Sequence, residues 1–278
     1  MSRGVLRVVA VLAPVLAFSP EAGAKERKPV DPARAAAAVE TLSKKGVKLD
    51  GEHLAGRVRN GDVESVRLFL DAGMDPDKGD GDTPPLEEAA TRGHVEVVKL
   101  LLDAGADPNR KNGNGATPLQ EAVAQRQAEV VRVLIAGGAN PNLSYKGTGE
   151  PPLVRASNVG SAETLMALLE GGADPNRADG NGATALLAEA RSGNVDTVKA
   201  LLAKGADPNV RAAGGGTALV MAVALDKVAV ARALLAGGAE IGKDRQVLTA
   251  SARSPEMKKL LANPPARTRP ASRKGGAK

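Results

Sequence analysis

The chain has 278 residues and carries 38 Lys and Arg against 32 Asp and Glu, a formal net charge of +6 and a pI near 9.6. It contains no cysteine, so disulfides and thiolate metal sites are excluded. Two Phe, one Tyr and no Trp leave almost no aromatic surface on which nucleic-acid bases would stack.

Residues 1–24 have the three parts of a secretory signal peptide. Arg3 and Arg7 are basic, residues 8–18 form an apolar run, and Ala22-Gly23-Ala24 is a cleavage site of small residues. The apolar run is about half of the ~20 residues that a membrane-spanning helix needs, which disfavours an anchor. We therefore predict cleavage after Ala24 and a periplasmic or secreted protein.

A short capping helix is predicted in residues 25–48. Asp31 is a typical N-cap residue, and Pro32 suits the first helical position. The Ala-rich segment that follows ends with two lysines before Gly46. We expect this helix to close the N-terminal end of the segment that comes next.

From residue 49 to residue 262 the chain repeats one pattern. Each copy ends in a Leu-Leu-x-x-Gly-like segment, and its glycine recurs at spacings of 32, 33, 34, 33 and 33 residues. The closing glycines are Gly73, Gly105, Gly138, Gly172, Gly205 and Gly238. Asp-Pro-Asn or a near copy follows most of them. Such a period predicts a stack of about six units rather than one globular core.

The second copy shows the local structure of each unit. Apolar residues recur three to four positions apart, first around Leu86 and again around Leu101, which predicts two short amphipathic helices. Gly93 and Gly105 are suited to end these helices in the left-handed conformation. The Asp-Pro-Asn and Gly-rich run after the second helix predicts a projecting turn.

These residues resemble the ankyrin repeat, whose unit of about 33 residues starts with Thr-Pro-Leu-His-x-Ala. Thr117-Pro118-Leu119 with Ala122 matches that start except for the histidine, and Gly93-His94 matches the middle. The resemblance covers roughly residues 49–262. It implies an all-α repeat solenoid of stacked helix-turn-helix units with β-turn or hairpin fingers. Since no copy has histidine after its leucine, we expect the family's threonine–histidine hydrogen bond to be missing.

The C-terminal end has two parts. Residues 247–252 and 255–261 predict a shortened helix pair that caps the stack. Residues 263–278 then carry five basic residues and no acidic one, which predicts a disordered basic tail. That charge would suit an anionic surface, although a solvated end is the simpler interpretation. Without the tail the repeats are close to neutral, which argues against nucleic-acid binding.

No residue pattern indicates catalysis or a cofactor. His53 and His94 lie on different copies and suit local structural hydrogen bonds. The run Gly214-Gly215-Gly216 is not followed by Lys-Ser or Lys-Thr, so it predicts a flexible turn and not a phosphate loop. Asp107 and Asn109 suit a turn better than a calcium site. We predict no enzyme activity, no metal and no cofactor.

Glu189 stands where other copies have a small alanine that packs between helices. A carboxylate buried there must be paired, or its stem must reach an edge where the head stays hydrated. We interpret Glu189 as the mark of a weakly packed copy and expect Glu189→Ala to raise the thermal midpoint.

The resemblance implies that a protein partner binds a concave face made of turn tips and first helices. Charged side chains dominate this face in the early copies and apolar ones in the later copies, and Tyr145 lies in the longest turn. The predicted partner-binding residues are Tyr145, Arg110, Lys111, Arg155, Leu187, Val220, Met221 and Leu225. We predict a monomeric, non-catalytic scaffold or adaptor. The alternative is an exported effector or immunity protein that blocks a toxin or host protein.

Overall fold

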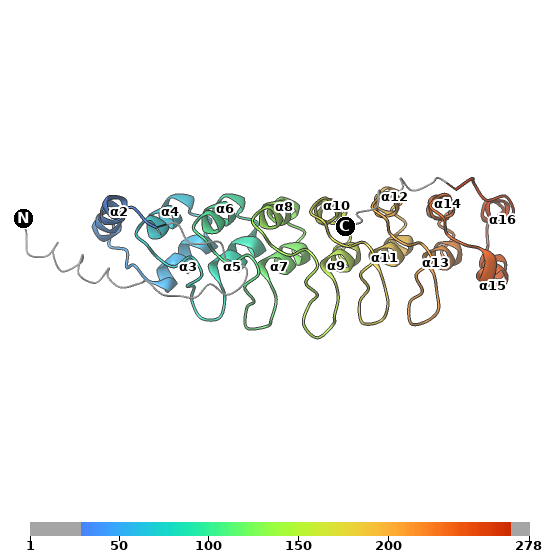
Figure 1. Ribbon diagram of the computed structural model, residues 1–278, viewed down its shortest axis with the longest axis horizontal. Helices are drawn as coiled ribbons and strands as arrows, with labels where there is room; N and C mark the ends of the chain where they lie inside the picture. The colour runs from blue at the N-terminus through green and yellow to red at the C-terminus, as the bar shows by residue number, and fades with distance from the viewer. Residues whose placement is uncertain (1–28, 268–278) are drawn as a thin grey trace, which may run out of the picture.

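The computed structural model describes residues 29–267, whose helices pair up along one axis (Figure 1). The predicted signal peptide, and the predicted tail from residue 268, lie outside the described residues. Helix α2 (Pro32–Lys44) comes first, with the Asp31 side chain accepting a hydrogen bond from the backbone N–H of Ala33. The capping helix expected after Asp31 is therefore present.

Helix pairs follow α2, and in each pair the first helix lies in an inner row and the second in an outer row. The pairs are α3 (Gly51–Arg59) with α4 (Val63–Asp71), α5 (Pro85–Arg92) with α6 (Val95–Asp103), α7 (Pro118–Ala124) with α8 (Ala128–Ala136), α9 (Pro152–Asn158) with α10 (Ala162–Glu170), α11 (Ala185–Ser192) with α12 (Val195–Ala203), and α13 (Ala218–Ala224) with α14 (Val228–Ala236). Figure 1 shows the two rows one above the other.

A 3₁₀ turn, η1 (Gly242–Asp244), leads into the last pair, α15 (Arg245–Ser251) and α16 (Pro255–Ala262). The Ser254 hydroxyl caps α16 by accepting from the Met257 N–H, and it donates to the Asp226 carboxylate at 2.7 Å. Asp226 follows α13, so this bond fastens the C-terminal helix pair to the last full repeat.

Local sequence explains where the helices begin and end. Thr117 caps α7, and Gly93 ends α5 in the left-handed region with φ of 78°. Arg126 and Asp226 hold the equivalent position with φ of 60° and 54°, which is strained for residues other than glycine. Helix lengths of seven to nine residues are too short for stability alone, so the packing between pairs holds them.

The core runs unbroken through the stack because the outer helices from α6 to α14 place the same leucine between their neighbours, and α4 places Phe69 there. Leu101, Leu134, Leu168, Leu201 and Leu234 are each 0% exposed. Alanines such as Ala89 and Ala122 fill the narrow space between inner helices and are also 0% exposed. Each repeat thus buries its apolar side only against adjacent repeats, as expected for a solenoid.

Asparagine side chains link the backbones of successive repeats. Asn176 accepts a hydrogen bond from the N–H of Asp207 at 2.7 Å and donates to the carbonyl of Gly205 at 2.9 Å. The same two bonds join Asn109 to Asn140 and Gly138, Asn142 to Asp174 and Gly172, and Asn209 to Glu240 and Gly238. We call these residues the asparagine ladder.

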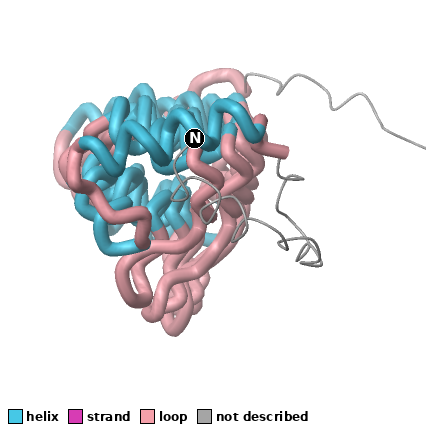
Figure 2. Tube along the Cα trace, turned by 90° about the vertical axis from the view of Figure 1, so that its left-hand side faces the viewer, coloured by secondary structure: helices cyan, strands magenta, loops and turns pink. Residues whose placement is uncertain are grey.

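The loops that connect one pair to the next project together on one side of the stack, as the end-on view shows (Figure 2). We call them fingers 1 to 5: residues 77–83, 110–116, 143–150, 177–183 and 210–216. Within the described residues, β-pairing is limited to isolated bridges between Asp80 and Thr83 and between Ala178 and Thr184. The fingers are therefore turns, and no extended hairpin is formed.

Candidate functional site

The inner helices and the fingers together form one surface, which we call the inner face. Successive inner helices α3, α5, α7, α9, α11, α13 and α15 lie side by side along it. This surface contains or borders all of the predicted partner-binding residues, and it differs in character from one end to the other.

At its N-terminal part the inner face is charged, and Glu88 is already paired. Glu88 accepts hydrogen bonds from Arg59 at 3.1 Å and from Arg92 at 2.7 Å. Burial works in the opposite direction, but these two bonds and the positive charges lower the pKa of Glu88. Arg59 comes from the preceding repeat, so the network joins neighbouring inner helices and leaves each of its three charged groups with a partner.

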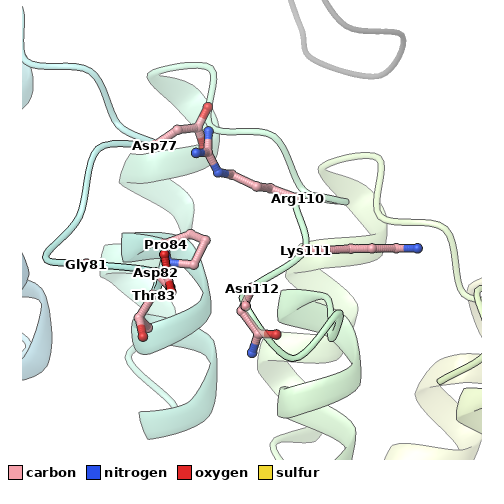
Figure 3. Close-up of a pocket in the computed structure, with 9 residues that line it drawn as sticks. Asp77, Gly81, Asp82, Thr83, Pro84, Arg110, Lys111 and Asn112 are labelled. Atoms are coloured by element: carbon pink, nitrogen blue, oxygen red, sulfur yellow. The ribbon is translucent and has the colours of Figure 1, made fainter. Parts of the chain in front are cut away.

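Fingers 1 and 2 enclose a polar groove of about 270 Å³ (Figure 3). Figure 3 shows the Arg110 side chain directed toward Asp77, whereas Lys111 points away from the groove. Asp77 also accepts a hydrogen bond from the backbone N–H of Asp107. Of the two predicted contact residues on finger 2, Lys111 is therefore the more available to a partner.

Glu87 and Gln120 occupy the position at which the resemblance expects histidine. Gln120 accepts from the Thr117 N–H and donates to the Leu143 carbonyl, each at 2.9 Å. The threonine–histidine bond is therefore replaced in this repeat and not simply lost, because Gln120 bonds Thr117 in place of the histidine. Glu87 is only 7% exposed, and its Oε1 accepts from Asn112 at 2.7 Å. Its Oε2 is buried without a hydrogen-bond partner.

Tyr145 fixes the longest finger to the neighbouring repeat. Its hydroxyl donates a hydrogen bond to the backbone carbonyl of Gln120, and the Arg155 guanidinium lies 5.9 Å from the ring centroid. Burial raises the pKa of the Tyr145 hydroxyl. The structure thus gives Tyr145 an internal role, and sequence reasoning, which treated it as a free contact residue, missed the bond.

A polar cluster joins α9 to α11 next to Tyr145. Glu150 accepts from the Asn158 amide at 2.8 Å and lies 3.7 Å from Arg155. Arg191 donates to the Asn158 side-chain oxygen at 3.3 Å. The Nε of Arg155 is buried without a hydrogen-bond partner. Glu150 is therefore paired with Arg155, whereas Arg191 reaches this cluster only through the neutral Asn158.

The C-terminal part of the inner face is apolar. Helix α13 has the sequence Ala-Leu-Val-Met-Ala-Val-Ala, and Leu225 directly after it is 45% exposed. Val220 and Met221 are half-buried against the core. Leu187 is 7% exposed, so its predicted contact role is not matched by an accessible surface. It packs at the position equivalent to Gln120.

Both histidines make local hydrogen bonds. His94 bonds the Arg59 carbonyl at 3.1 Å, and His53 lies 2.7 Å from the Asp50 carboxylate, which also caps α3. No three His, Asp or Glu side chains in residues 29–267 gather in a way that would hold a metal ion. In the same range no helix is long and apolar enough to cross a membrane.

Glu189 is 4% exposed and paired. Its Oε2 accepts hydrogen bonds from the Thr197 hydroxyl at 2.6 Å and the Ser192 hydroxyl at 3.0 Å. Because Thr197 belongs to α12, the carboxylate ties the inner helix of its repeat to the outer helix. It does not simply weaken the packing.

Because of these bonds, we expect Glu189→Ala to lower the stability, which is the opposite of the effect expected from the sequence. We expect the variant to lose about 1 kcal/mol of unfolding free energy, since both hydroxyls keep backbone acceptors in Asn194 and in residue 189 itself. Thermal unfolding followed by circular dichroism measures this loss of stability. Removal of the exposed Glu163 carboxylate by Glu163→Ala is the control and should change stability by less than about 0.5 kcal/mol. A higher midpoint for Glu189→Ala would restore the original interpretation.

Comparison with known proteins identifies the repeat. The family model "Ankyrin repeats (3 copies)" matches residues 53–145 and 146–245. The chain belongs to the ankyrin repeat family. Ankyrin stacks are generally non-enzymatic scaffolds that bind other proteins, and this ankyrin chain shares that architecture.

Two solved structures illustrate the likeness of this ankyrin stack. The ankyrin repeat protein EF0377 is 28% identical with a TM-score of 0.59, and the match covers 65% of this chain and 95% of that one. The ankyrin repeat domain of Bcl-3, described as a unique member of the IkappaB protein family, is 26% identical with a TM-score of 0.67. That match covers 77% of this chain and 100% of that one. A search of curated proteins finds no match.

Proposed function

We propose that this ankyrin protein is an exported, non-catalytic scaffold that binds a protein partner with its inner face. The observation that supports this proposal most is the contrast along the inner face, where paired charges on α5 give way to the apolar α13 and the exposed Leu225. Val220, Met221 and Leu225 gather on or directly after one helix, and a gathered set of accessible apolar side chains is typical of a contact surface.

Export is proposed from the N-terminal sequence alone. The protein purified from the envelope fraction or culture medium should begin at Lys25, and N-terminal sequencing measures this directly. A protein that still begins at Met1 would contradict cleavage after Ala24.

The binding face is tested by two charge-matched variants of the full chain. The inner pair is Glu121→Lys with Arg191→Glu, on α7 and α11. The outer pair is Glu129→Lys with Lys199→Glu, on α8 and α12 of the same repeats. Both pairs exchange the same charges at partly or fully exposed positions on opposite rows.

Each tagged chain is used to capture proteins from envelope extract, and the captured proteins are quantified. We expect wild type and the outer pair to hold the same partner and the inner pair to lose it at least tenfold. Equal capture by all three chains would exclude the inner face. The identity of the captured protein then decides between an adaptor and a protein that blocks a toxin or host target.

A further inference from the structure

The inner helices α9 and α11 each present an arginine, and none of α9, α11 and α13 presents an exposed acid. Their only carboxylate is that of Glu189, which is buried. Arg155 shares the single carboxylate of Glu150 with the Asn158 amide, and its Nε has no partner. Among the described ion pairs and hydrogen bonds, Arg191 contacts only the neutral Asn158. Arg191 is therefore the cation of this region that has no carboxylate partner among the described contacts.

The apolar surface begins one repeat further along. Met221 is half-buried, Leu225 is 45% exposed, and finger 5 beside them contains Ala212, Ala213 and three glycines. The one cation of that finger, Arg211, is held away by Asp244, which accepts from it at 2.8 and 3.0 Å. No unpaired charge remains near Leu225 on α13 or finger 5.

We propose that this half of the inner face binds a protein segment that carries a carboxylate and an aliphatic side chain at a fixed separation. The carboxylate pairs with Arg191 and the neighbouring Arg155, and the aliphatic side chain covers Met221 and Leu225. This inference rests on the proposed scaffold function and adds the chemistry of the partner. A guanidinium pairs well with a carboxylate because the two groups match as planar donor and acceptor.

The geometry of the stack sets the separation. Packed helices lie about 8–10 Å apart, so Arg191 on α11 and Leu225 after α13 are about one repeat apart, and Arg155 on α9 is about two. An extended segment advances about 3.3 Å per residue. The acidic and aliphatic residues of a partner that runs along the inner face should therefore be about three to six positions apart.

The test uses random 12-residue peptides displayed on phage, selected against the full wild-type chain and against four variants, one of which is the control Leu49→Ser. Arg191→Glu reverses the proposed carboxylate contact, and Lys199→Glu on α12 of the same repeat makes the same change on the outer row. Leu225→Ser removes the aliphatic contact. Synthetic copies of the selected peptides are then measured by fluorescence anisotropy.

We expect wild type and Lys199→Glu to select Asp or Glu about three to six positions from Leu, Ile or Val. Arg191→Glu should select Lys or Arg at that position instead and weaken the acidic peptides at least tenfold. Leu225→Ser should lose the aliphatic preference, whereas Leu49→Ser, at a residue of similar exposure (44%), should keep it.

Two outcomes overturn the proposal. In the first, the wild-type chain selects no peptides or only peptides without this pattern. In the second, Arg191→Glu selects the same acidic peptides as wild type. Either result leaves the scaffold function standing if the inner charge pair still abolishes capture of the natural partner. Equal capture by the inner and outer pairs would instead remove the scaffold function together with this inference.

Discussion

Replacing Leu168 with alanine is expected to lower the free energy of unfolding by about 3–4 kcal/mol. Leu168 is 0% exposed and lies on α10, in the middle of the stack. The loss combines the transfer energy of the removed carbons with the cavity left between α8, α10 and α12, because close-packed neighbours relax only partly. Urea unfolding followed by circular dichroism at 222 nm measures the effect.

The central position of Leu168 in the stack adds a second effect, on the cooperativity of unfolding. Each repeat contacts only its neighbours, so a weak middle repeat separates two halves that then unfold independently. We expect a lower m value or two transitions for Leu168→Ala. Leu261→Ala in α16, where the side chain is 6% exposed, is the control and should only fray the end. A single transition of unchanged m value in both variants would contradict this account.

In contrast to Leu168→Ala, Glu87→Gln should stabilise the protein and raise the free energy of unfolding by about 1–2 kcal/mol at pH 7. Gln120, at the equivalent position, donates through its amide to the Leu143 carbonyl. Glu87 has no such donor when ionised, and Pro84 at the cap position has no N–H to offer its Oε2. In the variant, we expect the amide oxygen to keep the Asn112 bond and the amide nitrogen to donate to the Arg110 carbonyl, which is equivalent in sequence to that of Leu143.

The gain from Glu87→Gln should depend on pH. Burial raises the pKa of Glu87; the Asn112 bond opposes this, and the carboxylates of Glu121 and Glu88 add to it. The folded protein then holds the proton more tightly than the unfolded chain. Wild type therefore loses stability as the pH rises from about 4.3, the unfolded value, through the raised folded value. The Glu87→Gln variant has no carboxyl group at this position, so it should not show this loss of stability.

Thermal unfolding of both proteins at pH 4 and pH 7 measures this difference. The variant should gain stability mainly at pH 7 and little at pH 4. The reverse substitution Gln120→Glu is the matched control, because it removes the donor to Leu143, and it should destabilise the protein. An equal gain at both pH values would show that charge burial at Glu87 is not the cause.

The sequence predicted the architecture well because the signals are local and repeated. A glycine at a nearly constant spacing and the apolar residues three to four positions apart before it predict the helix pairs. The positive φ angles of Gly93 and Gly105 confirm that these glycines end helices. The caps at both ends followed from Asp31, Pro32 and the shortened pair before residue 263. Each of these inferences needs only the backbone preferences of a few consecutive residues.

Contacts between repeats were harder to predict because they join residues about 25 to 35 positions apart. The hydroxyl of Tyr145, for example, bonds the backbone of Gln120, 25 positions earlier. Within one repeat, the bond from Thr197 to the buried Glu189 was also missed. Leu187 is buried beneath the turn instead of facing a partner. Such outcomes depend on how adjacent repeats sit against each other, which the periodicity does not specify. A hydrogen-bonding residue at the family's histidine position was a usable signal only for Gln120.

The asparagine ladder has a consequence for how such a chain changes length. Each asparagine holds backbone atoms of the following repeat, and the same atoms are offered at the same place by every repeat from Asn109 to Glu240. Removing or duplicating one whole unit would therefore recreate the same bonds at the new junction. Unequal recombination within the gene can lengthen or shorten the stack while each junction stays intact, so the reach of the inner face can evolve independently of its fold.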